Sequence, residues 1–169
     1  MLSLSIYNLG VQATGYVGQT VQVAGDTMPL ENGVAKATYV LGQNAESNTI
    51  LIKDADGNTV YTTNGDASAG THDFIWDGKD NLGNQLPDGA YQIVISPQAL
   101  SGQAAPSITT TVYGRVTGVA SDDNGIYIGL GDVTTTTIDN ILTSRGRDYW
   151  DEIVASVKGN DNALINENA

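Results

Sequence analysis

Short alternating segments separated by turn signals occupy the middle of this chain and limit the folds open to it. Four such segments lie at residues 50–53, 59–62, 72–76 and 91–96. Asp, Asn, Gly and Pro, which tolerate a positive φ or preset a turn, are concentrated between them, at residues 56–58, 64–66, 77–83 and 87–89. Several short strands at this spacing predict an antiparallel β-sandwich.

The same period-two pattern continues on both sides of this central set. Val21 and Val23 alternate with polar residues, residues 29–33 form a turn signal, and residues 35–41 follow as a second strand, which together predict a β-hairpin. Residues 109–119 and 125–130 predict two long strands joined by a tight turn. Residues 134–138 predict one more strand.

Two linker-like segments, residues 42–48 and 97–106, bracket the central strands. We therefore expect residues 43–103 to form an inserted sandwich. Residues 17–42 and 104–145 are then expected to pair as one discontinuous β unit, because neither part has enough strands to close a core alone.

Helical spacing of apolar residues is found at the two ends. Leu2, Ile6, Leu9 and Ala13 predict an amphipathic N-terminal helix over residues 1–16, although alternation at the start of this segment leaves a strand as the alternative. In the C-terminal tail, residues 146–169, helical spacing of Trp150, Ile153 and Val157 predicts a short helix. Asp148 is its expected N-cap and Gly159 its stop.

Charge and composition exclude several classes of function. Lys and Arg number 7 against 19 Asp and Glu, a net charge of -12, so we expect no nucleic-acid partner and no membrane-surface partner. The chain has no cysteine, which excludes thiol catalysis, thiolate metal sites and disulfides. No Lys or Arg precedes Lys36, so the basic start of a classical secretory signal is missing and export would need another route.

His72 is the only histidine, and Asp66, Ser68 and Asp73 lie near it in sequence. These residue types suggest a hydrolase triad. Neighbours on a strand point to opposite faces, however, so His72 and Asp73 do not act together. We interpret His72 as an ordinary strand residue and expect no catalytic site.

Three carboxylate pairs have the chemistry of calcium ligands or glycosidase acids: Asp54/Asp56, Asp77/Asp80 and Asp122/Asp123. Their spacing does not match a calcium loop, because Gly57 follows Asp56 directly and Lys79 stands where an oxygen ligand is needed. We expect these residues to form turns and expect neither a metal nor a cofactor.

Two further patterns have an ordinary structural interpretation. Gly125, Gly129 and Gly131 do not have the spacing of a phosphate-binding loop. Trp76 and Tyr91, with Phe74, are candidates for a sugar-binding platform, but their alternation with polar residues predicts that they belong to the sandwich core.

Residues 70–91, GTHDFIWDGKDNLGNQLPDGAY, carry the most specific motif in the chain. The segment resembles the aromatic-x-W-D-G-x-D-x-x-G-x-x-L-P-D-G-x-Y signature of the flagellar hook-capping (hook assembly scaffolding) protein family. Other parts are similar to the family's barrel entry, its second barrel half and its closing strand: residues 18–21, residues 116–118 with 129–131, and residues 138–141.

This resemblance implies an all-β fold, a Tudor-like β-barrel interrupted by a fibronectin III or immunoglobulin-like domain. It implies a non-enzymatic scaffold that sits at the distal end of the growing hook, outside the cell, after export by the flagellar type III route. The implied partners are hook protein and further copies of the chain. The family's N-terminal export and docking segment has no counterpart here, so we expect a core fragment. An extracellular Ig-like adhesin or carbohydrate-binding module is the alternative, and a small hydrolase is a third.

Overall fold

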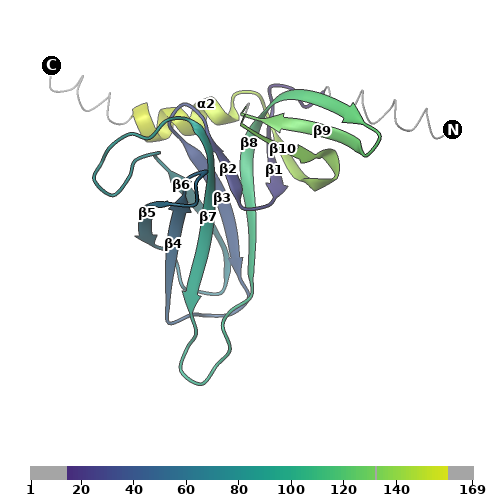
Figure 1. Ribbon diagram of the computed structural model, residues 1–169. Helices are drawn as coiled ribbons and strands as arrows, with labels where there is room; N and C mark the ends of the chain where they lie inside the picture. The colour runs from purple at the N-terminus through teal and green to yellow at the C-terminus, as the bar shows by residue number, and fades with distance from the viewer. Residues whose placement is uncertain (1–14, 132, 160–169) are drawn as a thin grey trace, which may run out of the picture.

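The computed structural model describes residues 15–131 and 133–159 (Figure 1). The strands come first along the chain: β1 (Thr20–Ala24), β2 (Thr27–Leu30), β3 (Ala35–Leu41), β4 (Ser47–Lys53), β5 (Thr59–Asn64), β6 (Gly70–Trp76), β7 (Gly89–Gln98), β8 (Ile108–Asp122), β9 (Gly125–Leu130) and β10 (Thr134–Thr137). A 3-10 turn, η1 (Ile138–Asn140), leads to strand β11 (Ile141–Arg145), helix α2 (Tyr149–Val154) and the π-helical turn η2 (Ala155–Gly159). The expected all-β class is therefore confirmed.

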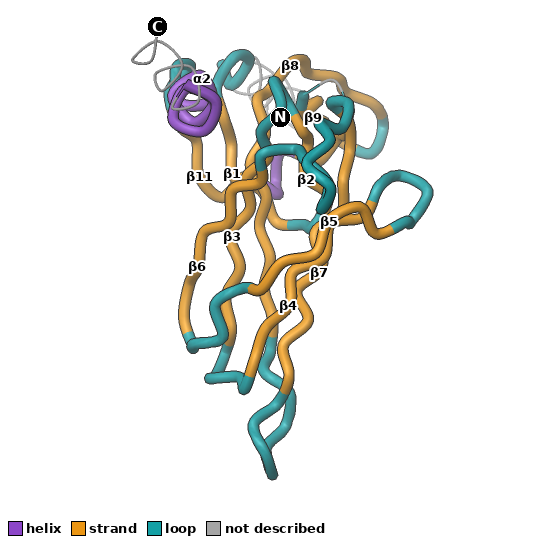
Figure 2. The backbone as a smooth tube through the Cα atoms, turned by 90° about the vertical axis from the view of Figure 1, so that its left-hand side faces the viewer, coloured by secondary structure: helices purple, strands orange, loops and turns teal. Residues whose placement is uncertain are grey.

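The strands form two antiparallel sheets that face each other (Figure 2). One is a 4-stranded sheet in the order β2-β7-β4-β5. The other is a 7-stranded sheet with the order β10-β9-β8-β1-β11, to which β3 and β6 are added because β3 pairs with both β8 and β6.

Strand β8 runs through both parts of the larger sheet. Its first residues pair with β3, its middle with β1, and its last part, from Val116 on, with β9. The register shifts between Val116 and Gly118, where the strand passes from the sandwich into the curled hairpin of β8, β9 and β10 (Figure 1). The two parts of the fold therefore share one continuous strand.

The predicted hairpin between residues 19 and 41 is wrong. The partners of β1 are β8 and β11, whereas β3 pairs with β6 and β8. The short strand β2 intervenes and pairs with β7, and it contains Pro29, which the sequence placed in a turn. Pro29 is tolerated there because β2 lies at the edge of its sheet and Pro has no N–H to donate to a second neighbour.

The strand pairings differ in part from the expected division into residues 43–103 and residues 17–42 with 104–145. As predicted, β1 pairs with strands of residues 104–145. Residues 27–41 behave differently, because β2 and one edge of β3 pair with strands of residues 43–103. The sandwich therefore takes strands from before residue 43. Within the polar stretch at residues 42–48, residues 42–46 form a loop between β3 and β4, and Ser47 and Asn48 already belong to β4. The stretch is therefore not the point at which pairing partners change.

The sandwich core lies between the two sheets, where Met28, Leu30 and Ile52 are fully buried. Trp76 and Tyr91 belong to this core, with 1% and 6% of their surfaces exposed, and their rings meet edge-on with centroids 5.0 Å apart. Phe74 is half-buried and packs against the same cluster. The assignment of Trp76 and Tyr91 to the core is confirmed.

The two ends of the chain differ in what the structure describes. The predicted C-terminal helix is confirmed as α2, with Asp148 at the N-cap position, but the Asp148 side chain makes no capping hydrogen bond. The predicted N-terminal helix over residues 1–16 lies outside the described residues, apart from residues 15 and 16, which are in a turn. Among the described residues, no helix is long and apolar enough to cross a membrane.

Candidate functional site

His72 contacts the loop at residues 66–68, and these contacts stabilise the loop but do not form a hydrolase triad. The His72 Nε2 atom lies 2.8 Å from the Ser68 carbonyl oxygen, and His72 Nδ1 lies 3.4 Å from Asp66 Oδ2. The Ser68 hydroxyl donates to Asp66 Oδ1 at 2.7 Å and so points to the carboxylate, not to the imidazole. Hydrogen bonds from the Ser68 hydroxyl and backbone hold the pKa of Asp66 below its usual range. A triad requires a base that contacts the nucleophile, which this loop does not provide.

Asp73 lies on the opposite face of β6, as the strand alternation predicts. Its Oδ1 atom accepts a hydrogen bond from the Thr38 hydroxyl of β3 at 2.7 Å. Asp73 is therefore directed away from His72 and joins two strands of the larger sheet.

The three carboxylate pairs are placed in turns. Oδ1 of Asp54 accepts backbone N–H groups from Asp56 and Asn58, at 3.0 and 2.9 Å. Asp77 and Asp122 each accept the N–H two residues further on. These are Asx-type turns, in which the carboxylate oxygen stabilises its own loop. No group of three or more metal-ligating side chains occurs among the described residues.

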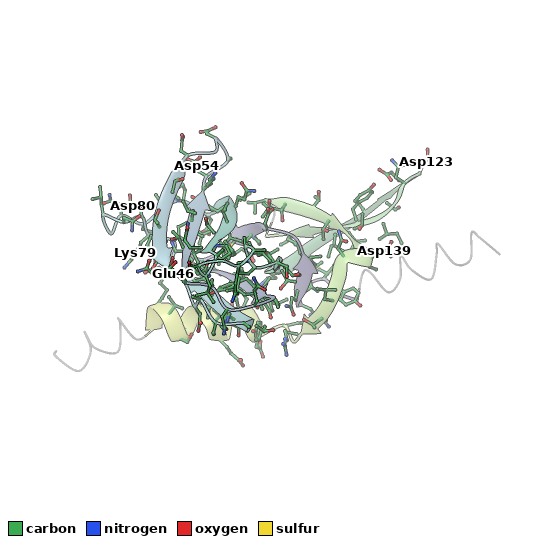
Figure 3. The ribbon with its side chains drawn as sticks, turned by 90° about the horizontal axis from the view of Figure 1, so that it is seen from below. Glu46, Asp54, Lys79, Asp80, Asp123 and Asp139 are labelled. Atoms are coloured by element: carbon green, nitrogen blue, oxygen red, sulfur yellow. The ribbon has the colours of Figure 1, made fainter. Side chains whose placement is uncertain are left out.

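Asp80 has the most complete turn of this kind. Its Oδ1 atom accepts N–H groups from Leu82 and Asn84, both at 2.9 Å, and the Asn84 backbone bond is the largest cause of a pKa below the usual range. In Figure 3, Asp54 and Asp80 lie at one end of the molecule, and Asp123 and Asp139 at the other. Negative charge is therefore present at both ends.

The aromatic side chains of the W-D-G motif region connect the turn at residues 77–89 to the sandwich core by hydrogen bonds. Trp76 Nε1 donates to the Lys79 carbonyl oxygen at 2.9 Å, and the Tyr91 hydroxyl donates to the Pro87 carbonyl oxygen at 2.7 Å. Gly78 has a φ of +75°, and a Cβ atom there would lie 2.5 Å from the Gln85 amide nitrogen. Only glycine fits this position without strain. Each aromatic side chain therefore fixes a backbone turn as well as filling the core.

The sugar-platform interpretation of Trp76 and Tyr91 finds no support in the geometry. A surface hollow of about 240 Å³ lies beside Trp76, lined by Tyr61, Phe74, Ile75, Trp76, Asp77 and Val157. It is smaller than the roughly 300–1,000 Å³ typical of ligand pockets. Trp76, at 1% exposure, presents almost no surface on which a sugar ring can stack.

The glycines considered for a phosphate loop are spread over a β-hairpin. Gly125 begins β9 with a φ of +140°, Gly129 lies within that strand, and Gly131 follows it in a turn with a φ of +60°. The described chain then continues into β10, so these glycines do not lead into a helix N-terminus as those of a phosphate-binding loop do.

The partners of the C-terminal helix form a cluster that the sequence did not specify. Trp150 of α2 is fully buried against Val34 and Tyr113, and its Nε1 atom donates to the Glu31 carbonyl oxygen at 3.2 Å. Lys36 Nζ donates to the Tyr149 hydroxyl at 2.7 Å and lies 4.7 Å from the centroid of the Tyr113 ring. Helical spacing of Trp150 was the only signal that predicted a buried face here.

The turn η2, which follows this helix directly, reaches the W-D-G turn. Lys158 Nζ donates to the Asp77 carbonyl oxygen at 2.8 Å and to Gln85 Oε1 at 2.9 Å. Arg115 of β8 and Asp151 of α2 form an ion pair at 2.8 Å. The segment of α2 and η2 therefore contacts both the W-D-G turn of the sandwich and strand β8, which continues into the hairpin with β9.

Comparisons with known proteins agree with this fold. A model of the FlgD Ig-like domain matches residues 25–100. The basal-body rod modification protein FlgD of Salmonella typhimurium is 35% identical over 140 residues, which is 78% of this chain and 60% of that protein. Its counterpart from Escherichia coli is 31% identical over the same shares. The chain therefore resembles FlgD proteins over most of its length, and residues 25–100 match their Ig-like domain.

Solved FlgD structures match the fold over 78% of this chain. FlgD from Xanthomonas campestris, described in connection with hook capping in flagellar assembly, has a TM-score of 0.64 and 28% identity, over 78% of this chain and 96% of that one. FlgD from P. aeruginosa has a TM-score of 0.63 and 25% identity, over 78% of this chain and 98% of that one. The interrupted-barrel fold class is confirmed.

The range of the FlgD Ig-like match agrees with the strand pairing. The match begins at residue 25, just before β2, and ends at residue 100, just after β7. The chain spans 60% of the length of the curated FlgD relatives.

Proposed function

We propose that this chain forms the body of a flagellar hook cap, a non-enzymatic scaffold at the distal end of the growing hook that promotes assembly of hook protein subunits. The observation that carries the proposal is the 35% identity to a basal-body rod modification protein over 140 residues, a span that exceeds the Ig-like domain alone. A free-standing Ig-like module would share only the sandwich.

The proposed partners are hook protein and further copies of the chain, and the proposed route is flagellar type III export to the outside of the cell. A scaffold of this kind works through its surfaces. Charged residues make up only 15% of the chain, so little desolvation of charge opposes packing against subunits. Exposed apolar side chains such as Leu82, at 87% exposure, and Leu142, at 57%, provide contact points.

A chimera tests the proposal. In a Salmonella strain without its own FlgD, the matching part of the Salmonella protein is replaced by residues 15–159 of this chain, so that the Salmonella protein supplies the rest. We expect hooks in electron micrographs and spreading on motility plates. The matched controls are the unaltered Salmonella protein and a chimera that carries an unrelated Ig-like sandwich. A chimera that is stable and exported but yields no hooks contradicts the proposal.

A further inference from the structure

The 4-stranded sheet ends in β2 on one side and in β5 on the other, as far as the structure describes the chain. A free strand edge carries unpaired backbone N–H and C=O groups, to which an extended segment of another chain can add. Strand β2 is a poor template for such addition, because it has four residues and contains Pro29. Strand β5, TVYTTN, has no proline, glycine or charged residue. It is therefore the edge of this sheet that needs protection.

The side chain of Asn81 lies against this edge. Thr62 N–H donates to Asn81 Oδ1 at 2.8 Å, and Asn81 Nδ2 donates to the Thr62 carbonyl oxygen at 2.9 Å. The side-chain amide thus makes the pair of hydrogen bonds that a residue of a neighbouring antiparallel strand makes. Both backbone groups of Thr62 point away from β4, with which β5 pairs on its other side. Asn81 therefore occupies part of the free edge of β5.

The loop between β6 and β7 fixes the position of Asn81. Before this residue, Trp76 Nε1 donates to the Lys79 carbonyl oxygen at 2.9 Å. Around it, Asp80 N–H donates to the Asn84 carbonyl oxygen at 3.0 Å, and Asp80 Oδ1 accepts the Asn84 N–H at 2.9 Å. Because these bonds already order the backbone of the loop, the contact with β5 costs little beyond the side-chain entropy of Asn81.

A second copy of β5 fits the edge that Asn81 covers. The period of two along a strand places the backbone groups of Val60 and Asn64 on the same edge as those of Thr62. Two antiparallel β5 strands with Thr62 opposite Thr62 bring Val60 opposite Asn64, and no like charges face each other. Two chains that each carry -12 can therefore meet here without charge repulsion between the paired residues. Uncharged segments of this length and β-propensity are typical of strands that associate edge to edge.

We propose that the free edge of β5 is a site for strand addition by β5 of a second copy, and that Asn81 keeps this edge closed. While Asn81 is bonded to Thr62, copies of the chain meet through other surfaces. The inference concerns the edge of the sandwich and does not depend on the hook-cap function.

Amide hydrogen exchange in the native chain tests the closed edge without any substitution. At low protein concentration, the Thr62 amide should exchange at least about tenfold more slowly than the amides of Val60 and Asn64, because Asn81 bonds to Thr62 and not to these two residues. In Asn81→Ala the three amides should exchange at similar rates. Similar rates in the native chain overturn the proposal.

Sedimentation equilibrium at one NaCl concentration tests the second part, the addition of another copy. The dissociation constant of the Asn81→Ala dimer should be at least about tenfold lower than that of the native chain. Asn84→Ala is the matched control, since Asn84 is an exposed asparagine of the same loop whose side chain donates to Asp80 Oδ2 at 3.3 Å. This variant should associate as the native chain does.

A second substitution shows whether the new contact uses β5. Thr62→Pro removes the edge N–H and is tolerated in β5, because the Thr62 N–H is not bonded to β4. Added to Asn81→Ala, it should return association to the native level. Association that persists in the double variant overturns β5 as the interface. An Asn81→Ala variant that associates no more tightly than the native chain overturns the role of Asn81.

Discussion

Trp76 fills the sandwich core and also fixes a turn. It is 1% exposed, contacts the Tyr91 ring, and donates a hydrogen bond to the Lys79 carbonyl oxygen. Trp76→Ala should therefore lower the free energy of unfolding by about 3–5 kcal/mol, as large aromatic truncations in packed cores do. Ile75→Ala, at a neighbouring position that is 41% exposed, is the matched control and should cost about 1 kcal/mol or less. Chemical denaturation of both variants decides; similar losses would contradict the assignment of Trp76 to the core.

Asp80 gives the fold a defined response to acid. Backbone N–H groups, that of Asn84 first, hold its pKa below the ordinary value of 3.8. Because the folded state binds the proton less tightly than the unfolded chain, the ionised carboxylate stabilises the fold above that value. The contribution is lost as the pH falls through the lowered pKa. Denaturation midpoints between about pH 6 and pH 2 should therefore fall more steeply for the native chain than for Asp80→Asn. Parallel curves would show that the turn does not depend on the charge.

At the scale of elements, the C-terminal helix should be held by Trp150 and not by its ion pair. Trp150 is fully buried, whereas the side chains of Arg115 and Asp151 are 27% and 67% exposed. Trp150→Ala should detach the helix and cost about 3–5 kcal/mol, while Asp151→Asn should cost about 1 kcal/mol or less. Limited proteolysis within residues 146–159 should become rapid only in Trp150→Ala. If the two variants are equally resistant to the protease, Trp150 does not hold the helix in place.

The elements also show how far the sequence predicts the structure. Alternation such as Ile50, Ile52 or Ile126, Ile128 shows which face of a strand is buried, and those strands were predicted. Alternation carries no information about the neighbouring strand, so the pairing of β3 with β6 was missed, although its pairing with β8 was expected. Strand β2 was not predicted as a strand, because Pro29 was placed in a turn. Strand β11 was not predicted as a separate strand because four of its five residues are exposed and the pattern has no apolar period.

The same limit applies to the candidate sites. Turn chemistry correctly assigned Asp54 and Asp80, because an Asx turn is local in sequence. The contact between Lys36 and Tyr149 joins residues 113 positions apart, and no local pattern specifies it. The pairing of Gly118 with Gly129 depends on a cross-strand register that shifts after Val116, so it too required the structure.

At the scale of the whole molecule, net charge should control self-association. Each copy carries -12, and carboxylates lie at both ends of the molecule (Figure 3). Copies therefore repel one another at low ionic strength, and salt screens this repulsion within about 10 Å at 0.1 M. Sedimentation equilibrium should show stronger association as NaCl rises from about 0.05 to about 0.5 M. Association that weakens with salt would indicate an interface made of ion pairs instead.

The position of the protein on a growing hook tests the hook-cap proposal most directly. In the Salmonella strain that carries the chimera, gold-labelled antibodies against the Ig-like domain of this chain locate it on isolated hooks in electron micrographs. A cap scaffold predicts a single cluster of gold at the distal end of incomplete hooks. Gold distributed along the hook, at its base, or absent from hooks that nevertheless assemble would contradict the proposal.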